Sequence, residues 1–438
     1  MLPEPLGGLI VDHSAVVGVI GLGYVGLPFA VEKAKVGFKV IGLDAQQARV
    51  DRVRAGSSYI DDVTDDELAE WVEKGLIEAT TDCERVPEMD VIVIAVPTPL
   101  TRNLTPDLQH IERVSTEVAA RLRPDQLVCL ESTTYPGTTE DVILPILETS
   151  GLTVERDFFL AHSPERVDPG NQRYTTKNTT KVVGGVGPRS LAVAEAFYAE
   201  TISRVVAMSS AKAAEMVKVF ENTFRAVNIA LVNELALLCD RMDLSVWEVL
   251  DAAFTKPFGI MPFYPGPGVG GHCIPLDPHY LEWKAREYNF TTRFIGLAGE
   301  INRRMPEFVR DKLLRVLGRR GVAASGARVL VLGVAYKRDL SDPRESPALT
   351  VIDLLLDEGM TITVHDTFVP SFEHRGRRYD SVELAPEVIA AADVVLILTD
   401  HSDVDYDTVV RNARHVLDTR NATRAVPPEV AAGRRTLL

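Results

Sequence analysis

The sequence predicts an α/β protein in which two doubly wound parallel-sheet domains are joined by a long central helical domain. Near both ends of the chain, short continuous apolar runs alternate with helical stretches, a pattern typical of parallel strands covered on both faces. Between them, residues 210–253 are mostly helix formers without a clear turn signal, so one or two long helices are expected there. With 438 residues the chain can form roughly two to four domains, each with its own core.

The predicted strands are the apolar runs at each α/β end, and they set the expected domain boundaries. Those of the first sheet are residues 15–20, 38–43, 91–96, 127–130 and 158–161. Those of the second sheet are residues 328–333, 360–365 and 394–399, with a helix over residues 347–358. We expect domains at residues 1–205, 206–322 and 323–438, with the two α/β ends as distant structural echoes of each other.

Charge and hydropathy narrow the class of partner. The formal net charge of −15 argues against a nucleic-acid or anionic-membrane partner, although a local basic pocket for an anionic substrate is compatible with it. The chain contains no apolar run long enough to span a bilayer, and residues 1–13 carry Glu4 and Asp12 but no Lys or Arg, unlike a signal peptide. We therefore expect a cytoplasmic protein.

The four cysteines are Cys83, Cys129, Cys239 and Cys273, and none forms a CxxC pair. Neither a zinc site nor a disulfide framework is therefore expected. Cys129 and Cys239 lie in apolar stretches and are expected to be small core residues. Cys273 instead follows Gly-Gly-His within a Gly/Pro-rich segment, which indicates an accessible thiol rather than a packing residue.

A glycine-rich turn follows the first predicted strand and opens a helix. Its residues are Gly21, Leu22, Gly23, Tyr24, Val25 and Gly26, and Asp44 ends the next strand. This context indicates a Rossmann-like dinucleotide site, with the pyrophosphate at the helix N-terminus and the ribose hydroxyls on Asp44. A carboxylate at that position favours NAD⁺ over NADP⁺. The alternatives are a glycine turn without a ligand and, for the nearby Arg49, an ordinary solvated helix residue.

Three polar clusters follow later strands of the first sheet: Pro97-Thr98-Pro99, Ser132-Thr133 and Ser163-Pro164-Glu165. Ligands of open parallel sheets bind beyond the carboxyl ends of the strands, so together these loops suggest a site that faces the nicotinamide. Each loop taken alone is unremarkable.

The central helix carries Lys218, Asn222 and Arg225 on one face, because the spacings of four and three residues match a helical repeat. A lysine and an asparagine directed into a cleft can stabilise a developing oxyanion. A solvated polar stripe is the alternative, and spacing alone does not decide between the two.

Two further loops carry candidate groups. The segment Gly266-Pro-Gly-Val-Gly-Gly-His-Cys273-Ile-Pro-Leu-Asp277 places glycines around one thiol, whose pKa His272 or a nearby cation would lower. The alternative is a free loop thiol. Lys337 and Arg344 follow a strand and precede a helix, where a diphosphate or ribose can be bound; alone, this is only a basic strand-end loop.

Seven motifs occur in one order along the chain: GLGYVGLPFA, PTP, EST, SPER, EMVKVFENTF, PGPGVGGHCIPLDP and AYKRDLSDPRESP. In this the chain resembles the family of UDP-glucose/GDP-mannose dehydrogenases, from about residue 15 to beyond residue 400. The resemblance implies an NAD-binding domain, a central helical domain that forms a homodimer, and a C-terminal domain that binds a nucleotide-diphosphate sugar.

The resemblance also implies roles for the residues that match the family motifs. Cys273 is the expected nucleophile, Lys218 and Asn222 stabilise oxyanions, and Thr133, Glu165 and Asp277 position water and transfer protons. The expected NAD contacts are Gly21, Gly23, Tyr24, Val25, Gly26, Asp44, Arg49, Pro97, Thr98, Thr133 and Arg344. The expected substrate contacts are Glu165, Arg166, Val167, Lys218, Asn222, Arg225, Phe263, Tyr264, Gly266, Gly270 and Lys337. No metal is expected.

The expected reaction is a four-electron oxidation of a sugar C6 alcohol to a carboxylate, which consumes two NAD⁺. Cys273 attacks the intermediate aldehyde, and the resulting thiohemiacetal is oxidised to a thioester that water hydrolyses. Segments 163–171 and 263–278 are similar to the branch that oxidises UDP-N-acetylhexosamines, and Leu276 stands where the glucose branch commonly has lysine. UDP-N-acetylglucosamine is the expected substrate, with UDP- or TDP-glucose as the alternative.

Two other functions fit parts of the pattern. A simple alcohol or β-hydroxyacid dehydrogenase shares the NAD domain and a helical lysine, but needs no cysteine and only one NAD⁺ per substrate. A sugar-nucleotide sensor on the same scaffold would show no turnover. The yield of NADH per sugar separates the first from a four-electron enzyme, and any turnover excludes the second.

Overall fold

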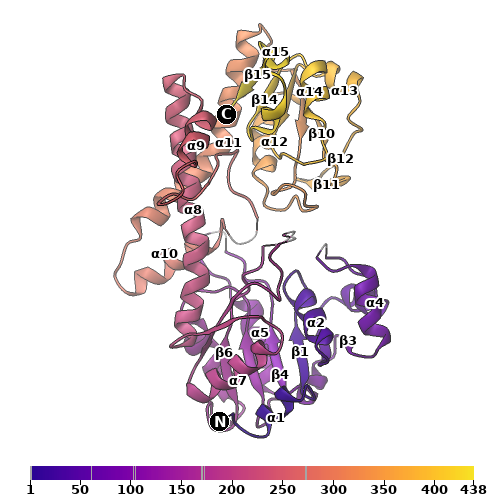
Figure 1. The fold of residues 1–438 in the computed structure, drawn as a ribbon, viewed down its shortest axis with the longest axis vertical. Helices are drawn as coiled ribbons and strands as arrows, with labels where there is room; N and C mark the ends of the chain where they lie inside the picture. The colour runs from indigo at the N-terminus through magenta and orange to yellow at the C-terminus, as the bar shows by residue number, and fades with distance from the viewer. Residues whose placement is uncertain are drawn as a thin grey trace. The chain divides into compact units, whose positions relative to one another are not determined.

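A computed structural model describes residues 2–60, 62–101, 103, 105–168, 171, 173–271 and 274–438 (Figure 1). The chain forms two compact units. The N-terminal unit contains the residues up to Glu221 together with His279–Phe290, and the C-terminal unit contains Asn222–Pro278 and Thr291–Leu438. The helix α8 (Ala211–Met242) begins in the first unit and ends in the second. The division into three domains at residues 205 and 322 therefore stays a prediction.

The N-terminal unit contains an eight-stranded sheet in the order β3-β2-β1-β4-β5-β6-β7-β8. Its strands are β1 (Val16–Ile20), β2 (Lys39–Leu43), β3 (Ile77–Thr80), β4 (Val91–Ile94), β5 (Leu127–Leu130), β6 (Phe159–His162), β7 (Lys181–Gly185) and β8 (Val205–Ala207). Neighbours from β3 to β6 are parallel, as predicted. The pair β6–β7 is antiparallel, so the parallel arrangement is not complete.

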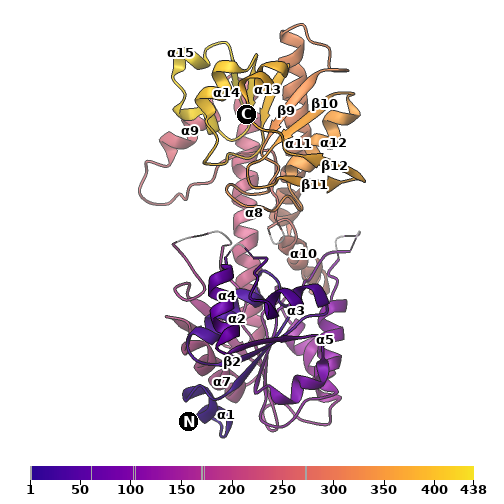
Figure 2. The same cartoon turned by 90° about the vertical axis from the view of Figure 1, so that its right-hand side faces the viewer.

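Helices cover both faces of this sheet (Figures 1 and 2). They are α1 (Leu6–Val11), α2 (Gly26–Lys35), α3 (Gln47–Arg54), α4 (Asp65–Glu73), α5 (Gln109–Ala119), α6 (Leu144–Glu148) and α7 (Pro188–Ala199), with short helical turns at Cys83–Glu88 and Thr139–Ile143. Alternate strand residues enter two separate cores, because successive side chains of a strand point to opposite faces. Val91 and Val93 pack with α2 and α7, whereas Ile92 and Ile94 pack with α5 and α6.

The C-terminal unit contains a five-stranded parallel sheet and a two-stranded hairpin. The sheet order is β10-β9-β13-β14-β15, with β9 (Arg328–Leu332), β10 (Thr361–His365), β13 (Val394–Ile397), β14 (Val416–Asp418) and β15 (Arg435–Leu437). The hairpin pairs β11 (Ser371–His374) with β12 (Arg377–Asp380). This order repeats that of β2-β1-β4-β5-β6, so the expected echo between the two α/β ends is found.

The remaining helices surround the second sheet or extend the central region. They are α9 (Val246–Ala253), α10 (Asp277–Glu287), α11 (Arg293–Arg319), α12 (Pro347–Asp357), α13 (Pro386–Ala391), α14 (Tyr406–Asn412) and α15 (Pro428–Ala431), with a short turn at Ala422–Ala425. Helices α8 and α9 together cover the predicted helical stretch of residues 210–253. Cys129 and Cys239 are buried, as expected. In the part of the chain that is described, no helix has both the length and the apolar character needed to cross a membrane.

Candidate functional site

The glycine turn after β1 has the shape of a dinucleotide cradle. Gly21 has φ of +98°, and a Cβ there would lie 2.4 Å from the carbonyl oxygen of Ala95. A Cβ on Gly26 would lie 1.8 Å from the carbonyl oxygen of Gly21, so both glycines are required by the protein's own packing. Around Gly23, in contrast, no atom of the described residues lies within 4 Å of the Cβ position, apart from those of Gly23 and its two chain neighbours. The turn thus leaves open backbone beside the N-terminus of α2, which fits a pyrophosphate.

Asp44 lies at the end of β2, where the ribose acceptor was expected. It is 5% exposed, and its carboxylate accepts hydrogen bonds from the backbone N–H of Leu22 at 2.9 Å and of Gln46 at 2.8 Å. Arg49 on α3 contacts the same carboxylate, with Nη1 3.3 Å from Oδ2. Arg49 is therefore not simply a solvated helix residue. Four acceptor lone pairs leave this carboxylate capacity for ribose hydroxyls.

The loops after β4 and β5 are tied to each other and to α10. The hydroxyl of Thr98 donates to the carbonyl oxygen of Thr133 at 2.7 Å, and Ser132 bonds both backbone polar groups of Val96. The buried Tyr280 donates its hydroxyl to the carbonyl oxygen of Thr98. These contacts fix the backbone of both expected NAD loops, and Pro97 beside them is exposed.

The loop after β6 carries Glu165, whose carboxylate is bound on both oxygens. Oε1 accepts from the backbone N–H groups of Arg166 at 2.7 Å and Val167 at 2.8 Å, and Oε2 accepts from Lys181 Nζ at 3.1 Å. Burial alone would raise the pKa of Glu165, but the Lys181 ammonium and the two N–H groups outweigh it and lower that pKa. Glu165 is therefore an oriented, ionised carboxylate at neutral pH.

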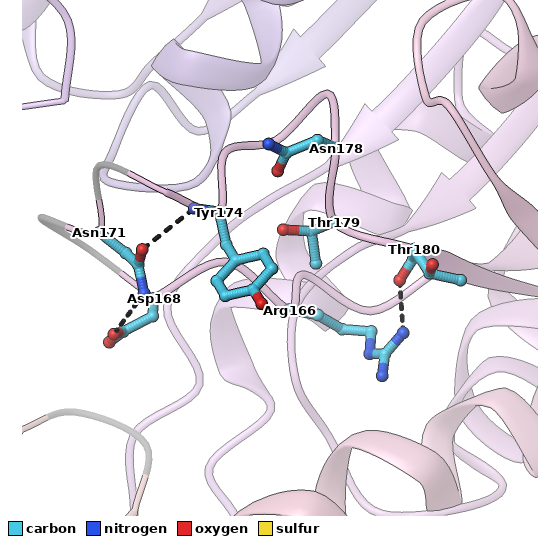
Figure 3. A pocket seen from close by; sticks show the side chains of 7 residues that line it. All are labelled: Arg166, Asp168, Asn171, Tyr174, Asn178, Thr179 and Thr180. Carbon is cyan, nitrogen blue, oxygen red and sulfur yellow. Dashed lines mark hydrogen bonds between the residues drawn. The ribbon is translucent and has the colours of Figure 1, made fainter.

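A hollow of about 310 Å³ lies beside this loop (Figure 3), lined by Arg166, Asp168, Asn171, Tyr174, Asn178, Thr179 and Thr180. Arg166 donates to the carboxylate of Glu221, with Nε 3.0 Å from Oε1, and to the carbonyl oxygen of Thr180. The amide oxygen of Asn171 accepts from the backbone N–H groups of Arg173 and Tyr174, both at 3.0 Å. Both side chains therefore already serve to shape the wall of the hollow.

The three polar residues of α8 differ in burial. Asn222 is 2% exposed and donates its Nδ2 to Oδ2 of Asp277, which is also 2% exposed. Lys218 is half-buried and Arg225 is exposed. A solvated stripe thus describes Arg225 but not Asn222. Asn222 and Asp277 are brought together, as two members of one site should be.

The Gly/Pro-rich segment packs against the loop that follows β9. A Cβ on Gly270 would lie 2.7 Å from Cδ of Pro347 and 2.9 Å from Cβ of Tyr336, and Gly271 is similarly close to the Tyr336 ring. The expected contact of Gly270 with the substrate stays a prediction; among the described residues, the atoms nearest to its Cβ position belong to Pro347, Glu345 and Tyr336. The packing brings two predicted site segments together. His272 and Cys273 lie outside the described residues.

The other expected substrate and cofactor residues of the C-terminal unit have defined surroundings. Phe263 packs edge-on against Phe224 at 6.1 Å, and Tyr264 stacks on Trp247 at 5.9 Å. Arg344 pairs with Asp342 at 2.7 Å while its side chain stays 55% exposed. Lys337 is half-buried on the loop after β9.

The sequence analysis did not single out three residues that adjoin the expected site: Arg420, Lys181 and Glu131. Arg420 follows β14, and its Nη1 lies 2.5 Å from where a Cβ on Gly266 would be. A basic residue after a strand was the available signal. Lys181 contacts Glu165 from the first position of β7, which gave no such signal. Glu131 directly follows β5 and was quoted only as part of the EST motif. Among the described residues, no cluster of three or more metal-ligating side chains occurs.

A dinucleotide cradle in one unit and a basic strand-end loop on a second α/β sheet are features that fit the class of NAD-dependent dehydrogenases of nucleotide sugars. The chain belongs to the UDP-glucose/GDP-mannose dehydrogenase family: residues 15–202 match its NAD binding domain, 212–304 its central domain and 330–425 its UDP binding domain. The recognition from sequence, the fold class and the NAD cofactor are thereby confirmed.

Several similar proteins are named as dehydrogenases of UDP-linked acetamido sugars. The chain is 36% identical to the UDP-N-acetyl-D-mannosamine dehydrogenase of Pyrococcus horikoshii over 94% of this chain and 96% of that protein. It is 36% identical to the UDP-N-acetyl-D-glucosamine 6-dehydrogenase of Pseudomonas aeruginosa, over 88% and 90%. The structure of a UDP-D-ManNAc dehydrogenase from Pyrococcus horikoshii superposes with a TM-score of 0.87 at 34% identity, covering 96% of this chain and 98% of that one.

Cofactor choice tests the role of Asp44. We expect the wild type to prefer NAD⁺, and Asp44→Ala to lower kcat/KM for NAD⁺ by about 10- to 100-fold, the effect of losing charged hydrogen bonds. NADP⁺ should improve relative to NAD⁺, because Arg49 is released from its ion pair. Asp51→Ala, which removes an exposed carboxylate on the same α3, is the control and should change neither value. Equal efficiencies of the wild type with both cofactors would contradict this role.

Proposed function

We propose that this protein oxidises the C6 hydroxymethyl group of UDP-N-acetylglucosamine to a carboxylate with two NAD⁺. The observation that carries the chemistry is the buried pair Asn222–Asp277, because Asp277 lies four residues beyond Cys273 and fixes an amide donor. When bound, NAD⁺ supplies the hydride acceptor for both oxidation steps.

In this proposal the protein's own residues handle the covalent and proton-transfer steps. The Cys273 sulfur forms a bond to the aldehyde carbon, and the carbonyl oxygen becomes an oxyanion. Asn222 donates one amide N–H to Asp277 and has a second for that oxyanion, which the Lys218 ammonium also stabilises. After the second oxidation, water displaces the sulfur, and Glu165 accepts its proton with Thr133 holding the water.

The covalent step predicts a specific defect for Cys273→Ser. We expect this variant to bind NAD⁺ and nucleotide sugar but to lose acid formation by at least about 10³-fold, because serine is a far weaker nucleophile at neutral pH. The wild type should yield two NADH per sugar in an absorbance assay with product analysis. Cys83→Ser, which removes a thiol from the connector before β4, is the control. Near wild-type acid formation by Cys273→Ser would refute the covalent mechanism.

The sugar assignment depends on sequence similarity and on what a C2 acetamido group requires. The Pseudomonas aeruginosa relative, named for UDP-N-acetyl-D-glucosamine, supports it, as does segment 163–171. UDP-N-acetylmannosamine is the second candidate, supported by the Pyrococcus relative. The two sugars are epimers at C2, so the acetamido group is common to both and only its orientation differs.

A substrate panel separates these possibilities. We expect kcat/KM to be highest for UDP-N-acetylglucosamine, with UDP-glucose lower by about 10-fold or more, because a donor that pairs with the acetamido group is left unsatisfied. NADH production with UDP-N-acetylmannosamine, UDP-glucose and TDP-glucose at matched concentrations provides the comparison. Preference for the mannosamine epimer would replace the sugar assignment, and preference for UDP-glucose would reject the acetamido group altogether.

We also propose a homodimer formed through α8. In the C-terminal unit one face of this helix exposes large apolar side chains at seven- and four-residue spacings: Phe224, Leu231, Leu238 and Met242, with exposures from 42% to 61%. Contiguous exposed apolar side chains of this kind mark interaction surfaces. A second copy of the same helix offers a self-complementary apolar face, as two-fold interfaces require.

Introducing a negative charge on the exposed apolar face of α8 tests the proposed dimer. Leu231→Asp and Leu238→Asp should shift the molecular mass in light scattering from twice the chain mass to the mass of a single chain. The control is Leu297→Asp on α11, because Leu297 is 53% exposed and Leu238 is 52% exposed. A monomeric wild type, or dissociation only in the Leu297 variant, would overturn the α8 interface.

A further inference from the structure

A cluster of buried charged groups lies in the core of the N-terminal unit next to Glu165. Lys181, the first residue of β7, places Nζ 3.1 Å from Oε2 of Glu165 and 3.1 Å from Oε1 of Glu131. The side chains of Lys181 and Glu131 are 4% and 0% exposed. Glu131 directly follows β5 and precedes the Ser132-Thr133 loop. One ammonium thus joins the carboxylates that follow two neighbouring strands.

The Glu131 end of the cluster is itself held in place. Its Oε1 accepts from the hydroxyl of Tyr198 at 2.7 Å, and that hydroxyl lies 3.1 Å from the sulfur of Cys129. Burial raises the pKa of Glu131 although Lys181 opposes this, whereas the pKa of Glu165 is lowered. The two carboxylates therefore differ: the one at the strand-end loop is ionised most readily, and the deep one holds protons more tightly.

A buried cluster of charged groups contributes little to the stability of the folded state. Desolvating an ion pair costs about as much as the attraction returns, and apolar residues of similar volume often serve as well or better. The apolar surroundings of Lys181 here, including Phe29 and Tyr198 with ring centroids 5.8 Å and 5.2 Å from Nζ, provide the packing for such a replacement. The presence of the Lys181 ammonium here is better explained by its effect on the orientation and ionisation of Glu165.

We propose that Lys181 is a positioning residue that orients the Glu165 carboxylate and keeps it ionised, with Glu131 and Tyr198 holding Lys181 in place. The inference rests on the proposed role of Glu165 as proton acceptor. Two backbone N–H groups fix one carboxylate oxygen and Lys181 fixes the other, so the plane of the carboxylate is set before a substrate arrives. A preset acceptor avoids reorganisation during proton transfer.

Lys33 on α2 provides a matched control, because it is a second buried lysine in the same core. Its Nζ lies 5.4 Å from the ring centroids of both Phe29 and Tyr198, the two rings that also flank Lys181. Its Nζ donates to the carbonyl oxygen of Phe197 at 2.7 Å and, within the part of the chain that is described, forms no ion pair with Glu165. Burial lowers the pKa of Lys33 well below its ordinary value. Replacing either lysine by methionine removes a buried amino group from the core, but only Lys181→Met removes the contact with Glu165.

Both charged and titratable groups surround Glu165. From the elements packed on it, these are Lys181, Glu131, Tyr198, Cys129, His162 and Lys33, with the Arg166–Glu221 pair on the loop side. Burial and the Lys181 ammonium lower the pKa of His162 to about 3, so this imidazole is neutral in the working range. Removing Lys181 takes away the ammonium that contacts the Glu165 carboxylate, so the pKa of Glu165 should rise.

The test compares Lys181→Met, Lys181→Arg and Lys33→Met by the pH dependence of kcat. We expect Lys181→Met to lower kcat by about 10- to 100-fold at neutral pH and to move the acidic limb of the profile upward by about one to three pH units. Lys181→Arg should keep the limb near its wild-type position because the charge remains. Lys33→Met should leave the limb unchanged. KM and NAD⁺ affinity should stay within about twofold of wild type for all three variants.

An unchanged acidic limb in Lys181→Met, or an equal shift in Lys33→Met, would overturn the proposal. A second measurement needs no turnover: infrared difference spectra over pH follow the carboxyl band of Glu165, assigned by its loss in Glu165→Gln. That band should titrate at higher pH in Lys181→Met than in wild type. Failure of the wild type to oxidise any nucleotide sugar would reject the proposed function, whereas an unmoved carboxyl band would reject the role of Lys181.

Discussion

The constraint on which both units depend is that parallel strands joined by crossover helices all end at one edge of their sheet. In the N-terminal unit, the glycine turn, Asp44, Thr98, Thr133 and Glu165 each follow a different strand, so the topology alone gathers them. Where these strands end, side chains take over some of the backbone N–H groups that the sheet no longer pairs. Asp44 accepts from Leu22 and Gln46, Ser132 accepts from Val96, and Glu165 accepts from Arg166 and Val167.

The two sheets use an equivalent aspartate differently, and the difference separates their functions. Asp44 accepts from two backbone N–H groups and keeps capacity for a ribose. Asp366, at the end of β10, accepts from four backbone N–H groups, those of Val334, Ala335, Phe368 and Val369, and also bonds the buried His401 at 3.0 Å. Burial would raise the pKa of Asp366, but these bonds lower it. A filled carboxylate offers no acceptor to a second dinucleotide.

The sequence predicts local features well and long-range contacts poorly. Strand positions such as β1 and β4 follow from continuous apolar runs, and the Gly21 turn follows from its place between a strand and a helix. In the sequence, Gly270 and Gly271 are simply two of the glycines near Cys273. In the structure, Gly270 packs against Tyr336 and Pro347, and Gly271 packs against Tyr336, residues more than sixty positions away. A contact between residues so far apart in the sequence produces no local pattern, so the residues around Gly270 do not indicate that Tyr336 will lie against it.

Lys181 shows why part of a site escapes sequence reasoning. A lysine at the start of an apolar strand is normally interpreted as a solvent-exposed strand end. The antiparallel pairing of β6 with β7, which places Lys181 beside Glu165, was not expected either. Its two partners, Glu131 and Glu165, lie 50 and 16 residues before it in the sequence. The apolar core around α2 and α7 offsets the cost of burying this ammonium, as folded proteins commonly do at functional sites. Burying Lys181 and Glu131 costs folding free energy in the N-terminal unit, and the same two side chains keep Glu165 oriented and ionised for proton transfer.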